Sequence, residues 1–544
     1  MKAIAIGIVL SALGLPGTTA AQVFREVLVD SLQSTPPSVW YGDAAWGDYD
    51  ADGDYDLFMT GNTRAFATAM PFSQLYLNDG DVVMPVPNPP SDEPILVPLS
   101  KYRDALSRDD PTLEDVWQSA VAWADYDNDG DLDVLATGIA RGGTNTTRLY
   151  ENIGGAERFA PRFDWPGVHM GDLDWGDYDN DGDYDFVVCG AAQDERPVCD
   201  LYENQTRSGG GFIRVDAGLD GLAYSSVEWG DYDNDGDLDV LTTGVAEPQA
   251  FVTRIYRNNG NGTFSALDAG LKGLLYATAA WGDYDADGDL DILVNGARLT
   301  PFFIEGQIKI YRNDNGVFSD VSSGLVGAFE NDLTRGRYHG AAEWGDFNND
   351  GRLDFFVTGA KDPRSPERGQ VYRTAPNDQF LKVQNDRFDG GLFGSAFWGD
   401  YDDDGDLDLF VLGEDPNDGL MIEALRNETP PFNTLPTAPD GLQAATQGNT
   451  VTLSWNPGSD AQTPAPGLSY NLRVGTTSGG VDVVSPMATA SGYRLVSRRG
   501  NAGHNTSWTL KNLPPGTYFW SVQALDSSFK GSPFAPEGTF TIGG

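Results

Sequence analysis

The 544-residue sequence has few cysteines, few histidines and few positively charged side chains. Its two cysteines and three histidines give no His/Cys metal cluster, and no Ser-His-Asp pattern or glycine-rich phosphate loop is evident. Only 35 lysines and arginines stand against 81 aspartates and glutamates, so the formal net charge is −46. Because a field of this sign repels phosphate groups, we expect neither nucleic acid nor an anionic membrane as a partner.

Long apolar segments are missing after the first residues. Residues 3–15 are apolar, follow Lys2 and precede the small residues Thr19, Ala20 and Ala21. This run is too short to span a bilayer and is typical of a cleaved export signal, although a buried N-terminal strand would show the same pattern. We therefore predict a signal peptide over residues 1–21, no membrane insertion, and a secreted or cell-surface protein.

The two cysteines, Cys189 and Cys199, lie on apolar runs that flank a short polar segment. This arrangement fits two neighbouring strands of one hairpin. In an oxidising compartment such a pair can form a disulfide. We predict this bridge, and two free thiols are the alternative.

Glycine is abundant, with 66 residues, and one phrase recurs seven times. It reads WGDYDNDGDLDVLTTG in its fourth copy. The seven copies begin at Trp46, Trp123, Trp175, Trp229, Trp281, Trp344 and Trp398. A weaker phrase such as IYRNNG at Ile255 follows each copy, and a run with a phenylalanine such as Phe264 usually comes next.

Each repeat therefore contains four short strand candidates separated by turn signals. Four strands per repeat at this period are typical of a propeller blade. We predict an all-β protein with a seven-bladed β-propeller over residues 22–429, and a linear solenoid is the alternative. The apolar run at residues 23–27 precedes the first repeat as a fourth strand does elsewhere, so it should complete the last blade.

Counted from its first aspartate as position 1, the loop of six repeats follows the spacing D-x-D-x-D-G-x-x-D, and the sixth repeat has Asn348 at position 3. So many carboxylates in one loop repel one another unless a cation neutralises them. Ca²⁺ prefers roughly six to eight oxygen ligands in flexible geometry, whereas Mg²⁺ keeps its waters and rarely occupies an all-protein cage. An EF-hand is excluded because position 12 lies in a strand and is never glutamate. Solvated acidic turns are the alternative.

The repeat resembles the FG-GAP/VCBS repeats of integrin-like propellers, over roughly residues 22 to 430. This resemblance implies a calcium-binding hairpin loop between the first two strands of each blade, hence about seven Ca²⁺ sites. The implied ligands, with position 7 contributing its backbone carbonyl, are Asp48, Asp50, Asp52, Asp54 and Asp56; Asp125, Asp127, Asp129, Asp131 and Asp133; Asp177, Asp179, Asp181, Asp183 and Asp185; Asp231, Asp233, Asp235, Asp237 and Asp239; Asp283, Asp285, Asp287, Asp289 and Asp291; Asp346, Asn348, Asp350, Arg352 and Asp354; and Asp400, Asp402, Asp404, Asp406 and Asp408. Since Asn348 lacks a charge and Arg352 adds a positive one, we expect the sixth site to be the weakest.

The face opposite these loops is the predicted ligand-binding face. The position five residues before each repeat tryptophan starts the innermost strand and should ring a channel mouth. Aromatic side chains there can stack on a sugar or an apolar group, although packing between blades is the alternative. With arginines from neighbouring loops, the candidate ligand-binding residues are Tyr41, Arg64, Tyr224, Tyr276, Arg298, His339 and Phe393.

The repeats end at a proline-rich linker, residues 430–439, and residues 440–544 form a separate module. A strand pattern at residues 451–455 carries Trp455, and Tyr518 precedes a second alternating run. This pattern resembles a fibronectin type III domain with Tyr518 as its tyrosine corner, which implies a β-sandwich.

Together these features predict a monomeric, calcium-binding adhesion or ligand-binding protein whose partner is an extracellular glycan or protein, and which is not an enzyme. His169 and His339 precede first strands and are the histidines placed for general acid/base chemistry, although a structural role is the alternative. The alternative function is a propeller-type extracellular polysaccharide lyase or hydrolase, because some lyases resemble such a calcium-loaded propeller.

Overall fold

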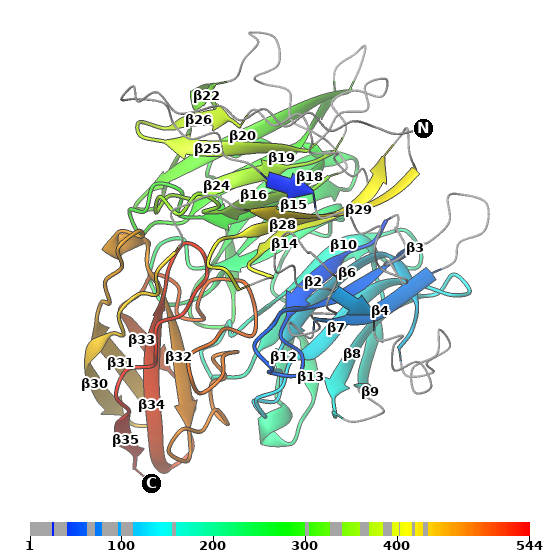
Figure 1. The fold of residues 1–544 in the computed structure, drawn as a ribbon. Helices are drawn as coiled ribbons and strands as arrows, with labels where there is room; N and C mark the ends of the chain where they lie inside the picture. Colours follow the sequence, from blue (N-terminus) through cyan, green and yellow to red (C-terminus); the bar gives the residue numbers. More distant parts are fainter. Residues whose placement is uncertain are drawn as a thin grey trace, which may run out of the picture.

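The computed structural model of the protein is built from strands (Figure 1). It describes residues 24–26, 41–62, 71–78, 96–98, 113–154, 159–299, 304–326, 340–359, 369–383, 394–401, 403–415, 419–427 and 433–543. Their secondary structure is β-strand apart from 3₁₀ turns at Thr206–Ser208, Ser322–Gly324 and Ala465–Gly467. The expected all-β class is confirmed. Within these ranges no helix has the length and apolar character that crossing a membrane requires.

The described part of residues 24–427 forms seven sheets, six with four strands and one with five. The first three sheets are β2 (Ala44–Gly47), β3 (Asp56–Asn62), β4 (Pro71–Asn78) and β5 (Leu96–Pro98); β6 (Val116–Ala124), β7 (Asp133–Ala140), β8 (Asn145–Asn152) and β9 (Phe159–Pro166); and β10 (His169–Gly176), β11 (Asp185–Ala191), β12 (Pro197–Asn204) and β13 (Phe212–Val215). The next two are β14 (Ala223–Gly230), β15 (Asp239–Ala246), β16 (Ala250–Asn258) and β17 (Phe264–Leu267); and β18 (Leu275–Gly282), β19 (Asp291–Leu299), β20 (Ile304–Asp314) and β21 (Val317–Asp320). The sixth contains β23 (Ala342–Gly345), β24 (Asp354–Val357), β25 (Gln370–Ala375) and β26 (Gln379–Lys382), with β22 (Leu325–Val326) parallel to β26.

The seventh sheet joins the two ends of the repeat region. It contains β27 (Ala396–Gly399), β28 (Asp408–Asp415), β29 (Gly419–Asn427) and, as its fourth strand, β1 (Phe24–Glu26). Strand β1 is antiparallel to β29, with Phe24 opposite Asn427. The prediction that the N-terminal strand completes the last repeat is confirmed.

Each repeat tryptophan closes the first strand of its sheet and packs against the sheet before it. The indole N–H of Trp229 donates to the carbonyl of Asp174 at 3.2 Å, and that of Trp123 donates to Ala45 at 3.1 Å. Glycine follows six of the seven tryptophans, and Ala124 follows Trp123. The glycine makes room for the next sheet, because a Cβ on Gly230 would lie 2.8 Å from Trp281. Contacts of Trp46 with Tyr401 and Phe410 bring the seventh sheet against the first.

The asparagine of the weaker phrase ties neighbouring sheets together. The amide of Asn258 in β16 donates to the carbonyl of Tyr178 in the preceding sheet at 2.8 Å, and Asn204 and Asn313 make the same bond to Tyr126 and Tyr232. Because these groups are buried, the recurring asparagine replaces water as the partner of an otherwise unpaired carbonyl.

Residues 433–543 form a separate body of two three-stranded sheets, drawn in orange and red (Figure 1). One sheet contains β30 (Asp440–Gln447), β31 (Thr450–Asn456) and β33 (Ser507–Leu510), and the other contains β32 (Ser469–Gly475), β34 (Gly516–Leu525) and β35 (Gly538–Ile542). Trp455, Tyr470 and Trp520 lie in the core between them.

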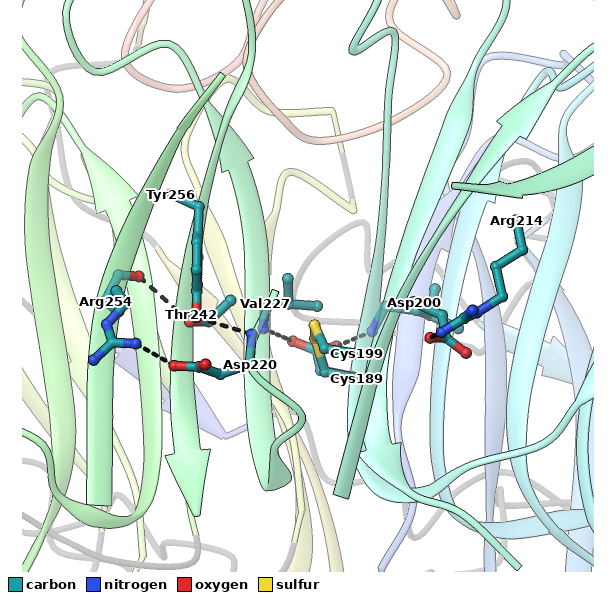
Figure 2. Close-up of a disulfide and its surroundings, with 11 residues drawn as sticks. Cys189, Cys199, Asp200, Arg214, Asp220, Val227, Thr242, Arg254 and Tyr256 are labelled. Carbon is teal, nitrogen blue, oxygen red and sulfur yellow. Dashed lines mark hydrogen bonds and ion pairs between the residues drawn. A yellow bond between two sulfur atoms is a disulfide. The ribbon is translucent and has the colours of Figure 1, made fainter. Parts of the chain in front are cut away.

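The two cysteines form a disulfide, as predicted (Figure 2). Cys189 in β11 lies directly opposite Cys199 in β12, with 4.0 Å between their Cα atoms. The bridge packs into the apolar cluster between the third and fourth sheets, which contains Val227 and Tyr256.

Candidate metal-binding loops and channel mouth

The aspartate-rich spacing falls in the turn between the first and second strands of each sheet, and the loop holds its own shape. In the second sheet the carboxylate of Asp125, at position 1, accepts the backbone N–H groups of Asp129 at 2.9 Å and Gly130 at 3.0 Å. The carboxylate of the aspartate at position 1 accepts this pair of hydrogen bonds in all seven loops. Gly130 has a φ of +101°, which explains the invariant glycine at position 6.

Position 9 links each loop to the rest of its sheet. The carboxylate of Asp133 accepts the N–H of Tyr126 at 3.2 Å and that of Asn152 at 2.8 Å. The aromatic residue at position 2 in turn stacks on the tryptophan of the next sheet, as Tyr178 does on Trp229. The loop geometry is therefore fixed by both its own sheet and the neighbouring one.

These bonds bring the carboxylates of positions 1, 3 and 9 together. Among the described residues, one oxygen from each of the three lies within 4.8 Å of the others in five loops, which is an arrangement that can hold a metal ion. The five clusters are Asp48, Asp50 and Asp56; Asp125, Asp127 and Asp133; Asp177, Asp179 and Asp185; Asp231, Asp233 and Asp239; and Asp283, Asp285 and Asp291.

The electrostatics of these clusters fit a bound cation. Burial, with the neighbouring carboxylates, raises the pKa of Asp125 to about 7, that of Asp283 to about 8 and that of Asp239 to about 9. Within the described ranges, one buried oxygen of Asp233 and one of Asp285, both at position 3, accept no hydrogen bond. A divalent cation would neutralise the charges and bind these oxygens, which are the hard ligands that Ca²⁺ prefers.

The sixth and seventh loops differ from the other five. In the sixth, the amide of Asn348 at position 3 donates a hydrogen bond to the carboxylate of Asp354 at position 9. A hydrogen bond therefore joins two positions whose side chains would both bind the metal ion in the other loops. In the seventh, Asp402 at position 3 lies outside the described residues. The weak sixth site remains a prediction, and the Asn348–Asp354 bond gives it a structural reason.

On the opposite face, one cavity of about 170 Å³ touches residues in the first strand of four sheets and residues just before the first strand of the other three. Its lining includes Tyr41, Gln118, Met170, Tyr224 and Tyr276, together with Gly340 and Gly394 of the last two sheets. We call it the mouth cavity. The chain segments that lead into all seven first strands therefore meet at this one cavity.

The five cavity-lining residues that lie five positions before a repeat tryptophan share an unusual backbone conformation. Tyr41, Gln118, Met170, Tyr224 and Tyr276 all have φ values between +48° and +49°. Strand pairing shifts by one bulge at the residues that follow Gln118, Met170, Tyr224 and Tyr276. The rings of Tyr224 and Tyr276 meet edge to face with 4.9 Å between centroids, and Tyr224 is 38% exposed.

The structure therefore gathers three of the candidate ligand-binding residues, Tyr41, Tyr224 and Tyr276, at one cavity. Arg298 is exposed near the end of β19 and is not among the residues that line the mouth cavity. Arg64, His339 and Phe393 lie outside the described residues. Nδ1 of His169 accepts a hydrogen bond from the amide of Asn145 at 2.9 Å, and the side chain is buried, which fits the structural alternative.

Sequence reasoning missed a set of carboxylates on the innermost strands. Asp43 accepts the N–H of Val121 at 3.0 Å, and Asp172 accepts that of Val227 at 3.1 Å. Asp174 and Glu228 make equivalent bonds to Trp229 and Trp281 of the next sheets, at 2.9 and 2.8 Å. The sequence feature that could have revealed these carboxylates is an acidic residue one or three positions before a repeat tryptophan.

Comparison with known proteins identifies the repeats. A family model described as FG-GAP-like repeat matches residues 246–294, 302–357 and 346–411. A search of curated proteins gives no match.

Among solved structures, the extracellular domain of a protein named as a hybrid two-component system from B. thetaiotaomicron has a TM-score of 0.37 and 10% identity, over 94% of this chain and 56% of that one. This chain thus spans little more than half of that structure. An α-L-arabinofuranosidase from Fusarium graminearum has a TM-score of 0.33 and 10% identity, over 57% of this chain and 92% of that one. A thermostable family-43 glycoside hydrolase has a TM-score of 0.27 and 11% identity, over 53% of this chain and 96% of that one.

These matches correct one expectation. The sequence was interpreted as that of a protein without enzymatic activity, but glycoside hydrolases stand among the structures that it matches. The exclusion of an enzyme is therefore wrong. At TM-scores below 0.5 the matches themselves assign no reaction to this chain.

Proposed function

We propose that the protein is an extracellular, calcium-binding, seven-bladed β-propeller that engages a glycan at the mouth cavity. The observation that carries this proposal is that one cavity, lined by three tyrosines, touches residues in or just before the first strand of all seven sheets. The contact of Trp46 with Tyr401 supports a closed ring. The disulfide supports an oxidising, extracellular location. The proposed signal peptide, residues 1–21, lies outside the described residues.

The C-terminal body is proposed to be a fibronectin type III-like domain beginning near residue 440. Two features support this assignment. The hydroxyl of Tyr518 donates to the carbonyl of Pro514, four residues upstream, at 2.7 Å, which is the bond that defines a tyrosine corner. Two sheets also enclose one apolar core. Of the proposed linker, residues 433–439 are described and contain no strand.

Calcium is the proposed metal because the clusters offer only oxygen ligands in a curled loop. Extracellular calcium modules bind with dissociation constants of about 10⁻⁴ to 10⁻³ M. Isothermal titration calorimetry on metal-free protein should detect at least five Ca²⁺ ions per chain in this range. Binding of fewer than three ions, or preference for Mg²⁺, would contradict the assignment.

Glycan binding at the mouth cavity is tested on a glycan array in calcium. The aromatic faces of Tyr224 and Tyr276 offer stacking surfaces for a sugar ring. Replacing both by alanine should weaken binding at least tenfold, whereas Ile213→Ala, at an exposed apolar side chain that does not line the cavity, should leave binding unchanged. Equal effects of the two changes would place the glycan elsewhere.

A second candidate function is glycan cleavage at the same cavity. Asp43 and Asp172 directly follow the cavity-lining residues Gly42 and Gly171. Burial raises the pKa of Asp43 to about 6 and that of Asp172 to about 8, with the charge of Asp43 also raising the latter. Hydrolysis of glycosides uses two carboxyl groups, of which one stays protonated near neutral pH and acts as the acid.

This second function is tested by incubating the protein with neutral and uronate polysaccharides and measuring reducing ends and unsaturated products. If cleavage occurs at this cavity, Asp172→Asn should lower the rate by a factor of about 10² to 10⁴. Asp164→Asn, on exposed β9, is the matched control. Glycan binding without any product would leave only the first function.

A further inference from the structure

The C-terminal domain rests on the face of the repeats that carries the metal-binding loops. The amide of Asn505 donates to Asp231 at 2.7 Å, and the ammonium of Lys511 lies 3.0 Å from Asp237, both in the fourth loop. The hydroxyl of Ser527 donates to Asp346 in the sixth loop at 2.6 Å. In the fourth and sixth loops, the C-terminal domain thus contacts the aspartate at position 1, whose carboxylate shapes the loop.

The backbone of the loops takes part as well. The N–H of Asp48 in the first loop donates to Leu495 at 2.9 Å. The N–H of Lys511 donates to the carbonyl of Asn180 in the third loop at 2.8 Å. The N–H of Ser485 donates to the side chain of Asn128 in the second loop at 2.8 Å. These bonds require the first, second and third loops to keep their curled shape.

Two arginines of the C-terminal domain enter the centre of the ring of first strands. Arg498 lies 3.4 Å from Asp174 and donates to the carbonyl of Trp175 at 3.0 Å. Arg499 lies 3.0 Å from Glu228 and donates to the carbonyl of Trp281 at 2.8 Å. Both arginines line a cavity of about 160 Å³ between the two domains. They cover the inner strands at the loop face, opposite the mouth cavity.

We propose that metal binding and docking of the C-terminal domain are coupled: metal-loaded loops form the docking surface for residues 433–543, and loss of the metal releases this domain and withdraws Arg498 and Arg499. The proposal rests on the metal sites proposed above. Without a cation, three carboxylates within 4.8 Å repel one another, and this repulsion weakens the hydrogen bonds to positions 1 and 9 that shape the loop backbone. Linkage then requires that docking also strengthens metal binding.

The first experiment follows the intact protein by small-angle X-ray scattering and hydrogen exchange, in calcium and after chelation. In calcium the domain should be docked, with residues 483–500 protected. Chelation should increase the radius of gyration and remove that protection, while the strands of the C-terminal domain stay protected. An unchanged scattering curve with retained protection would overturn the coupling and leave the metal sites untouched.

The second experiment measures calcium affinity of the double variant Arg498→Gln and Arg499→Gln by calorimetry. Neither side chain is a proposed metal ligand, and removing two positive charges near the loops would by itself strengthen calcium binding. Coupling predicts the opposite sign, namely an affinity three- to tenfold weaker than that of the wild type. Arg196→Gln removes the same kind of charge from an exposed hairpin outside this interface and should change nothing.

The outcomes of these experiments distinguish failure of the coupling from failure of the metal sites. Unchanged or tighter calcium binding by the double variant overturns the coupling, even if chelation unfolds the sheets and makes the scattering uninformative. Absence of calcium binding by the wild type instead refutes the metal sites of the proposed function. Weaker binding by the double variant, with Arg196→Gln unaffected, supports the coupling.

Discussion

Asn258→Ala tests whether the recurring asparagine holds neighbouring sheets together. Asn258 is 1% exposed. Its amide donates to the carbonyls of Tyr178 at 2.8 Å and Leu238 at 3.2 Å, and its oxygen accepts the N–H of Gly260 at 3.0 Å. The substitution therefore leaves two carbonyls and one N–H without this partner.

The expected cost follows from the burial of these groups. A buried polar group that loses its partner costs about 1–3 kcal/mol. Gly260 lies in an exposed turn where water can replace the bond, so its contribution is small. The two carbonyls lead us to expect that the free energy of unfolding falls by about 3 kcal/mol.

The assay is urea unfolding in saturating calcium, followed by tryptophan fluorescence. Asn259→Ala is the matched control, because Asn259 is exposed and bonds only with Thr263 and Ser265 of its own turn among the described residues. A loss below about 1 kcal/mol for Asn258→Ala, or one equal to that of the control, would refute the role of the asparagine ladder.

Four further outcomes are expected. Chelation should lower the melting temperature strongly, because five sites at tenfold excess calcium contribute roughly 7 kcal/mol; an unchanged melting temperature would contradict this. Chelated protein should lose stability as pH rises from the ordinary aspartate pKa of 3.8 through the raised pKa values of about 7 for Asp125 and about 8 for Asp283. The reason is that the folded state binds more protons than the unfolded state over this pH range. Calcium should reverse the slope of melting temperature against pH, because it binds the deprotonated carboxylates. Replacing both Cys189 and Cys199 by alanine should cost about 2–3 kcal/mol in urea unfolding, and a change below about 1 kcal/mol would contradict a stabilising bridge. Gly230→Ala should cost about 1–3 kcal/mol because its Cβ meets Trp281 at 2.8 Å, and a neutral result would contradict this packing.

The periodic features of the sequence predicted most of the repeat region. The tryptophan at the end of each first strand, the glycine at position 6 and the N-terminal strand that completes the last sheet follow from local chemistry repeated seven times. Regular spacing makes such features visible, since each copy confirms the others. The disulfide was predictable for a related reason, because both cysteines lie on adjacent strands of one hairpin.

The contacts between the two domains could not be predicted in this way. Arg498, Arg499 and Asn505 occur once each, in turns without periodic pattern, and their partners lie more than 200 residues earlier in the chain. Only the tertiary arrangement brings them to the loops. The Asn348–Asp354 bond was equally invisible, because the same amide could have offered its oxygen to a metal.

The position of β1 in the seventh sheet determines when during synthesis the repeat region can complete its folding. The other three strands of the seventh sheet end at Asn427 in β29, the partner of β1, some four hundred residues after Phe24. A ribosome releases the N-terminus first, so Phe24–Glu26 has no sheet to join until nearly the whole repeat region has been synthesised. The earliest segment of the repeats is thus the last to find its place, and shortening the chain at either end of residues 24–427 leaves the same sheet incomplete.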